Sequence, residues 1–378
     1  MKKIYLRTMI VAAILLLCST ANAFSTVING ISYELDSKTA SVERNNKYTG
    51  NITIPEVVVY EGTTYKVEEI SDSAFYNCTS LTSVTIPNSV TSIGEGAFNG
   101  CQSLTSIDIP NSVTSIGERA FDGCQSLTSI NIPNSVTTIG EGAFSGCQSL
   151  TSINIPNSVI TIGERAFAGC TSLTSIDIPN SVTTIGESAF SDCDDLKSIN
   201  IPNSVTSIGE RAFFWCTRLK SVTIGNSVTA IDFNTFEGCT SLTDIYCYAT
   251  TAPQAYGSVF GDLNYTNATL HVPAEAIEEY RNSTPWSDFG SIVALTDKDI
   301  SLGVNDVEST QLHITVANGF FTINGATEGS VVTVYTASGV AAGKATVTNG
   351  TAAIETTIQK GETAIVTAGG KSIKVVAQ

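Results

Sequence analysis

A period of 23 residues runs through the middle of the chain and constrains its fold more than any other feature. Cysteine recurs at this step eight times, from Cys78 to Cys239, and phenylalanine keeps the same step from Phe75 to Phe236. A fixed period of this size is typical of a solenoid, in which each unit buries its apolar edge only against its neighbours. The repetition therefore predicts stacked coils, with the residues of one repeat position forming straight columns.

Each repeat contains two short segments that can be extended. The segment LTSIDI at 104–109 has the L-x-x-L-x-L form of leucine-rich repeats, and alternation directs its leucine and isoleucines inward and Asp108 outward. Pro110 and Asn111 predict a turn, because proline fixes one backbone corner and asparagine tolerates the next. VTSIG at 113–117 is the second extended segment, and Phe121 follows as the largest core residue. Parallel strands about 4.8 Å apart are expected along the stack.

The repeated phrase IPNSVTSIGEGAFNGCQSLTSI, present from about Ile70 to Tyr246, resembles that of the BspA-like leucine-rich-repeat family of bacterial surface proteins. Upstream, INGISYELDSKTASV is similar to the family's entry unit, and downstream APQAYGSVF and TLHVPAEAIEEYR are similar to its closing unit. The resemblance implies a solenoid fold and, for some members, adhesion to host proteins. It carries no set of ligand-binding residues.

The pattern changes near Lys298, where alternating segments broken by Gly and Asn begin, such as SVVTVYTASG. This pattern predicts a small antiparallel β-sandwich. The strand–GGK–strand ending is similar to the C-terminal sorting domains of the type IX secretion system, and an immunoglobulin-like spacer is the alternative.

Together these patterns predict a mainly β fold, a leucine-rich-repeat solenoid of parallel β-coils followed by an antiparallel β-sandwich. The expected divisions are a signal peptide at 1–23, an N-terminal capping unit at 24–69, the solenoid of about eight repeats at 70–247, a closing unit at 248–297 and the sandwich at 298–378.

The first residues are typical of an export signal. Lys2, Lys3 and Arg7 precede the apolar run MIVAAILLL at 9–17, and ANA at 21–23 is a small-residue cleavage site. Lipidation of Cys18 is the alternative, although Leu17 stands where a small residue is expected before a lipidated cysteine. No later stretch is long and apolar enough for a transmembrane helix. We expect an extracellular or cell-surface location.

The formal net charge of −16 at pH 7 disfavours nucleic acid and anionic lipid as partners. The sequence also offers little to an enzyme: it holds two histidines, and it lacks a phosphate-binding glycine motif and His-rich metal spacing. We therefore expect no catalytic residues, no metal and no cofactor.

The cysteine column allows two interpretations. Neighbouring coils bring cysteines within disulfide range, and exported proteins meet oxidants. Thiols aimed in parallel nevertheless fit the S–S dihedral poorly, and cysteine also serves as a small buried hydrophobe. Free buried thiols are the favoured interpretation.

The outward column of the first extended segment is the main candidate surface for a partner. Its members are polar and hydrogen-bonding, and the candidates chosen are Asp108, Asn131, Asn154, Asp177 and Asn200. Solenoid faces often serve as extended binding surfaces. The alternative is that these side chains only keep a strand face soluble.

One repeat departs from the others in a way that indicates a second candidate. It reads AFFWC, placing Phe214 and Trp215 where small or polar residues stand elsewhere, with Arg211 and Arg218 nearby. Aromatic residues with arginine are typical of interaction hot spots. The alternative is that they cover the junction with the closing unit. Arg119, Arg165 and Arg211 each follow a glutamate, which indicates local charge balance.

These features predict non-catalytic adhesion at the bacterial surface, with host matrix or cell-surface proteins as partners and their glycans as a further candidate. A structural spacer role and a glycan-binding role within a surface complex are the alternatives.

Overall fold

The computed structural model describes residues 23–296 and, beyond them, 313–317, 320–324, 331–336, 341–348, 351–356, 358, 362–368 and 371–376. The expected signal peptide lies outside these residues, apart from Ala23. The same is true of the GG pair in the strand–GGK–strand run that resembles a sorting domain.

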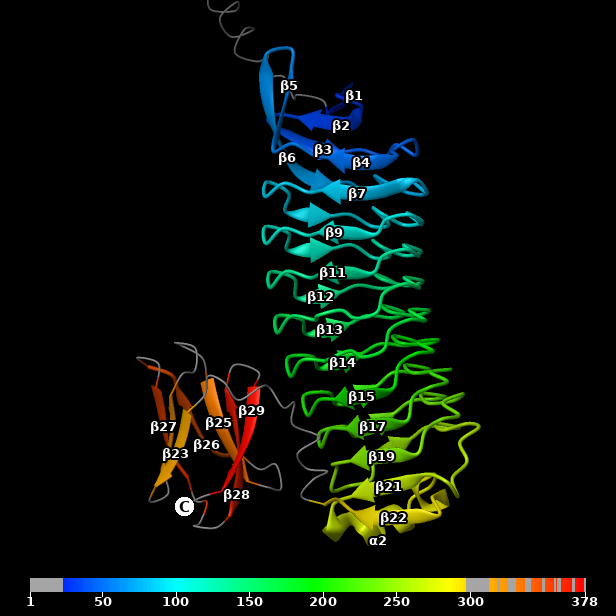
Figure 1. Ribbon diagram of the computed structural model, residues 1–378, viewed down its shortest axis with the longest axis vertical. Helices are drawn as coiled ribbons and strands as arrows, with labels where there is room; N and C mark the ends of the chain where they lie inside the picture. Colours follow the sequence, from blue (N-terminus) through cyan, green and yellow to red (C-terminus); the bar gives the residue numbers. More distant parts are fainter. Residues whose placement is uncertain are drawn as a thin grey trace, which may run out of the picture.

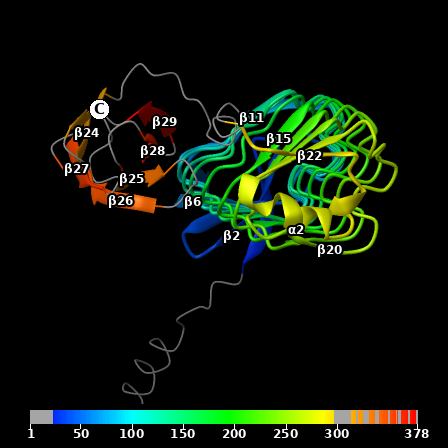
Figure 2. The same ribbon diagram turned by 90° about the horizontal axis from the view of Figure 1, so that it is seen from below.

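The central part of the chain is a solenoid of stacked coils (Figure 1), and this confirms the expected fold class. Each coil contributes one short strand to each of two parallel rows, which Figure 2 shows on opposite sides of the coil. The first row consists of β4 (Gly50–Thr53), β7 (Leu81–Thr85), β9 (Ser106–Asp108), β11 (Ser129–Asn131), β15 (Ser198–Ile201), β17 (Ser221–Ile224), β19 (Asp244–Cys247), β21 (Thr269–Val272) and β22 (Ser291–Ala294).

The second row is built from the VTSIG-type segments. It consists of β6 (Thr63–Ile70), β8 (Ser92–Ile93), β10 (Ser115–Ile116), β12 (Thr138–Ile139), β13 (Thr161–Ile162), β14 (Thr184–Ile185), β16 (Ser207–Ile208), β18 (Ala230–Ile231) and β20 (Gln254–Ala255). Partners in both rows are 23 residues apart wherever the repeat is regular, as with Ser115 and Ser92. The sequence period is therefore the strand register.

The core is a set of columns, as the sequence predicts. The phenylalanine rings from Phe75 to Phe260 stack with centroids 4.9 to 5.6 Å apart and planes within 13° of parallel. Leucine, isoleucine, valine and cysteine columns are buried beside them in one continuous apolar cluster from Ile31 to Phe289. Each coil is thin, so this burial comes almost entirely from its two neighbours.

The parallel stack begins before the regular repeat. Three strands form an antiparallel cap over the first coil, namely β1 (Phe24–Ile28), β2 (Ile31–Asp36) and β3 (Thr39–Val42). The longer first turn expected from the sequence is a hairpin, in which β5 (Val57–Tyr60) pairs antiparallel with β6. Since β3 already pairs parallel with β6, and β4 with β7, stacking starts inside the segment predicted as a cap.

The stack also continues beyond residue 247, through β21 to β22. The 3-10 helices η1 (Ala274–Ala276) and η2 (Trp286–Asp288) and the short helix α2 (Ile277–Arg281) close this end (Figures 1 and 2). Tyr280 and Trp286 are buried there, and Trp286 donates a hydrogen bond from Nε1 to the Pro253 carbonyl at 2.9 Å. A coil end without a neighbour needs such apolar cover.

The last part of the chain holds two antiparallel sheets, as predicted. One has the order β23 (His313–Ala317), β24 (Phe320–Asn324), β27 (Thr351–Glu355), and the other β26 (Ala341–Thr346), β25 (Val331–Thr336), β28 (Thr363–Ala368), β29 (Lys371–Val376). Residues from both sheets, among them Phe321, Ile354 and Val366, share a second apolar core.

Candidate functional site

The outward column of the first strand row lies where the sequence places it. Asp108, Asn131, Asn154 and Asp177 are exposed, and Asn200 is half-buried. Asn131 pairs in register with Asp108, and isolated bridges join Asn131 to Asn154 and Asn154 to Asp177. The structure therefore brings four exposed amide and carboxylate side chains into one straight line.

The buried sides of the same coils hold the cysteines. The nine cysteines that the structure describes, eight in the column plus Cys247, are free thiols and buried, which agrees with the favoured interpretation. In successive coils each thiol donates a hydrogen bond to the carbonyl of a phenylalanine 26 residues earlier, for example Cys147 to Phe121 at 3.3 Å. Burial raises the pKa of Cys101 and Cys170 to about 12, so these thiols stay protonated and poorly nucleophilic at neutral pH. The column belongs to the core and carries no chemistry.

The four residues proposed for the corner lie on the turn that follows each short second-row strand. The Arg211 guanidinium forms an ion pair with Glu210 at 2.8 Å and lies 5.8 Å from the centroid of the Phe214 ring. Phe214 contacts Trp215, with ring centroids 6.2 Å apart. Arg218 forms an ion pair with Asp195 of the preceding coil. Both arginines are thus neutralised locally, while Trp215 is 50% exposed.

The backbone at Trp215 is unusual. Its φ is +56°, and the same repeat position is glycine with positive φ in five other coils, at Gly100, Gly123, Gly146, Gly169 and Gly238. The left-handed conformation costs an L-residue about 1–2 kcal/mol, and bulky residues adopt it rarely. Strained positions of this kind concentrate at functional sites. Since the half-exposed indole gains little burial in return, folding alone does not explain a tryptophan here.

Two further aromatic residues extend this corner, and the sequence reasoning missed them. Phe233 and Tyr256 are 47% and 38% exposed, with ring centroids 6.1 Å apart. The Arg211 amide donates to the Phe233 carbonyl at 2.9 Å, which fixes Phe233 in the coil beside the corner. A usable signal existed, because Phe233 occupies the position that is glutamate in the preceding coils, such as Glu187 and Glu210. We call Phe214, Trp215, Phe233 and Tyr256 the aromatic shelf.

The glutamate–arginine pairs are local, as expected, but they follow two patterns. Arg165 pairs with Glu164 of its own coil at 2.8 Å, as Arg211 does with Glu210. Arg119 instead reaches Glu141 of the next coil. These exposed pairs neutralise part of an acidic column and are worth little individually.

Within the part of the chain that the structure describes, no group of three or more His, Cys, Asp or Glu side chains is placed to hold a metal ion. Among the same residues, no helix has both the length and the apolar character needed to cross a membrane.

Comparison with solved structures finds other bacterial leucine-rich repeat proteins. The Treponema pallidum leucine rich repeat protein is 29% identical over 58% of this chain and 91% of its own, with a TM-score of 0.45. A leucine-rich repeat protein from Bacteroides ovatus is 24% identical over 72% and 100%, with a TM-score of 0.36. A leucine rich cell surface protein from Faecalibacterium prausnitzii is 25% identical over 72% and 95%, with a TM-score of 0.37.

No curated protein matches the chain. The family described as the BspA type leucine rich repeat region matches it in six copies, over residues 68–193 and 160–282. These overlapping matches cover residues 68–282, more than half of the 378 residues. Because the matched residues are the coils whose columns and register are described above, this chain belongs to the BspA type leucine-rich repeat family.

Proposed function

We propose that this protein is a non-catalytic adhesin of the bacterial surface, which binds host matrix or cell-surface proteins through the outer surface of its coils. The observation that carries this proposal is the exposed, in-register column formed by Asp108, Asn131, Asn154 and Asp177. Side chains fixed at the strand spacing can form many weak contacts along one partner, and such contacts add without further ordering of the surface. The aromatic shelf and its two arginines supply the anchoring contacts of the same surface.

The rest of the fold supports a platform. The buried thiols and the stacked phenylalanines make neighbouring coils one continuous core, so the column cannot bend independently of it. The formal charge of −16 favours partners other than nucleic acid or anionic membranes. In this proposal the signal peptide directs export, and the C-terminal sheets serve sorting or attachment at the cell surface.

The test compares two sets of four substitutions in the full-length protein. The first changes Asp108, Asn131, Asn154 and Asp177 to alanine. The matched control changes four exposed asparagines on the turns of the same coils, namely Asn111, Asn134, Asn157 and Asn180. Binding to immobilised fibronectin, fibrinogen, laminin and collagen is measured by surface plasmon resonance.

We expect the unchanged protein to bind at least one of these proteins, the column variant to bind it at least tenfold more weakly, and the control to bind it as before. Both variants should retain the melting temperature, because every changed side chain is exposed. Equal binding by the two variants would refute the role of the column. Absence of binding to all four proteins would favour the alternative that the coils are a spacer.

A further inference from the structure

The aromatic shelf is confined to one end of the stack. In the column of Phe214 the preceding coils carry small or polar residues, namely Asn99, Asp122, Ser145, Ala168 and Ser191. In the column of Phe233 they carry glutamate. Coils that share one packing solution have no structural need for aromatic residues at exposed positions, so this local change indicates a selected surface.

Trp215 is held as a flat plate against the next coil. A Cβ atom placed on Gly238 would lie 2.7, 2.8 and 3.0 Å from Cδ1, Cγ and Nε1 of the indole. Three nearly equal distances mean that the face of the indole, and not its edge, covers the Gly238 Cα. Because half of the side chain is exposed, the opposite face is presented to solvent.

Phe233 repeats this arrangement one coil further. A Cβ atom on Gly257 would lie 2.4 and 2.7 Å from Cδ1 and Cε1 of the Phe233 ring, so this ring also rests on glycine backbone. Tyr256 contacts Phe233 from the side with its plane tilted by 30°. The shelf is therefore an open surface of aromatic faces fixed to the main chain, and its members need no rearrangement to receive a ligand.

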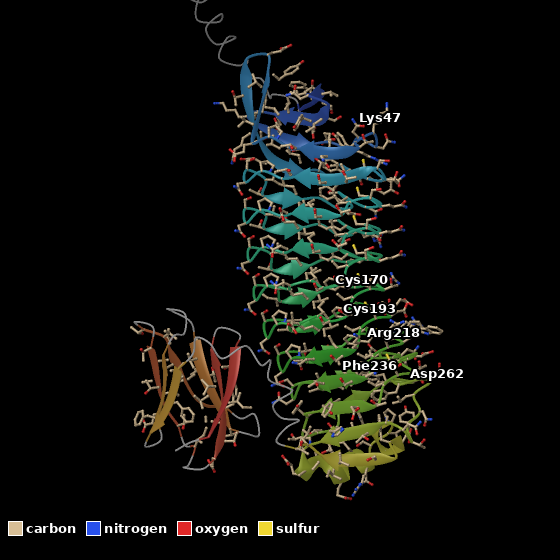
Figure 3. All side chains as sticks on the ribbon, in the orientation of Figure 1. Lys47, Cys170, Cys193, Arg218, Phe236 and Asp262 are labelled. Carbon is tan, nitrogen blue, oxygen red and sulfur yellow. The ribbon has the colours of Figure 1, made fainter. Side chains whose placement is uncertain are left out.

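The charges around the shelf restrict what it can bind. Arg211 and Arg218 are each paired with an acid, Glu210 and Asp195 respectively. Glu237 and Asp262 form no ion pair among the described residues, and Figure 3 shows Asp262 along the same edge of the stack as Arg218. The unpaired charges beside the shelf are thus carboxylates, which accept hydrogen bonds from hydroxyl groups and repel anions.

We propose that the aromatic shelf binds a neutral oligosaccharide built of hexopyranose rings. A pyranose has a flat face of C–H groups, which carry partial positive charge and are attracted by the negative face of an indole or phenyl ring. Its hydroxyl groups project from the rim, where Glu237, Asp262 and the two ion pairs offer hydrogen-bonding partners. An apolar protein side chain would instead require a hollow to fill, and the shelf presents flat faces.

This inference rests on the proposed function, because it names the chemistry that the corner recognises on the partner: a glycan carried by the bound protein or cell.

The two tryptophans of the chain make a direct test available. Trp286 is fully buried and hydrogen-bonded, so a ligand that stacks on the surface changes the fluorescence of Trp215 alone. The full-length protein is titrated with cellohexaose, maltohexaose and mannohexaose, and with tetragalacturonate as an acidic comparison. Isothermal titration calorimetry with the same sugars gives the affinity without relying on fluorescence.

Trp215→Gly is the decisive variant, because it restores the glycine that five other coils use and should not impair folding. Tyr76→Asn is the matched control: Tyr76 is an exposed aromatic of the Phe214 column at the other end of the array, and the next coil has Asn99 there. We expect at least one neutral hexaose to shift the emission to the blue and to bind saturably. Trp215→Gly should weaken calorimetric binding about tenfold or more, and Tyr76→Asn should leave it unchanged.

Three results would overturn the inference: no response to any neutral sugar, binding of tetragalacturonate alone, or equal sugar affinity in Trp215→Gly and the unchanged protein. If the sugars fail while Trp215→Gly still weakens binding to a deglycosylated matrix protein, the shelf is a protein-binding anchor and the adhesin proposal stands. If matrix proteins fail to bind while a hexaose binds through Trp215, the adhesin proposal fails and the glycan site stands.

Discussion

The indole of Trp215 covers the Cα of Gly238 in the following coil, with a vacant Cβ position only 2.7 Å from Cδ1. This contact joins two consecutive coils at the surface and sets the orientation of the shelf. It also makes the glycine at 238 necessary for a reason that other glycines of its column do not share.

Gly238→Ala should displace the Trp215 side chain. Both this variant and the control Gly146→Ala carry the penalty of a left-handed alanine, about 1–2 kcal/mol. Only in Gly238→Ala does the new methyl group meet a ring, since the nearest atoms at Gly146 are 3.5 Å away in Gly123. We expect Gly238→Ala to increase acrylamide quenching of tryptophan fluorescence and Gly146→Ala to leave it unchanged. Equal quenching in both variants would contradict the contact.

Coils also approach closely at a second glycine column, and its members differ. A Cβ on Gly117 would lie 2.5 Å from the Glu95 nitrogen, whereas one on Gly140 would lie 3.6 Å from the nearest atom, in Glu118. Gly117→Ala should therefore lower the free energy of unfolding by about 1–3 kcal/mol through overpacking against backbone. Gly140→Ala should change it by less than about 1 kcal/mol. Urea denaturation followed by circular dichroism compares the two, and equal losses would show that the coils can shift apart.

The phenylalanine column should dominate local stability. Phe144 is fully buried between Phe121 and Phe167, at 5.5 Å from each. Phe144→Ala should cost about 3–5 kcal/mol, because neighbouring coils cannot collapse into the cavity. Phe233→Ala, at an exposed ring, should cost far less. Hydrogen exchange should show the loss of protection centred on the coils next to residue 144, and a uniform loss along the whole stack would contradict nearest-neighbour stabilisation.

Alkaline pH should weaken the stack through its thiols. Burial raises the pKa of Cys170 to about 12 from an ordinary value of 9.0. The folded state therefore keeps a proton that the unfolded state releases, so the stability contributed by the protonated thiol is complete below pH 9 and is lost as the pH rises towards 12. Each such thiol contributes a slope of about 1.4 kcal/mol per pH unit in this window.

The melting temperature measured from pH 8 to 10.5 under reducing conditions checks this slope. A double variant, Cys147→Ala with Cys170→Ala, removes two buried thiols and should show a shallower decline with pH, even though it is less stable at pH 8. Parallel declines in the two proteins would assign the alkaline loss to other groups, such as Tyr33, whose pKa burial also raises.

Much of the molecule was predictable because the sequence repeats. Since every regular coil has 23 residues, the positions of Phe121, Cys124 and Asp108 in one coil define their columns along the regular part of the stack, and the alternation of LTSIDI assigns each side chain to the core or to solvent. The repeated wording similarly predicts free thiols, because identical coils aim their cysteines in parallel. The antiparallel sheets at the end of the chain follow from short alternating segments broken by glycine.

The tertiary structure alone decided contacts between residues of different coils that the repeat does not distinguish. Arg119 and Arg165 stand in identical GER motifs, yet one pairs with the next coil and the other with its own. The backbone approach at Gly117 but not at Gly140, and the resting of Trp215 on Gly238 and of Phe233 on Gly257, depend on small differences in how consecutive coils are placed. The sequence determined the columns, because one-dimensional order repeats exactly one packing solution along the chain. The structure decided the aromatic shelf, because its members meet across the gap between coils, where ångström-scale geometry and not residue type sets the contact.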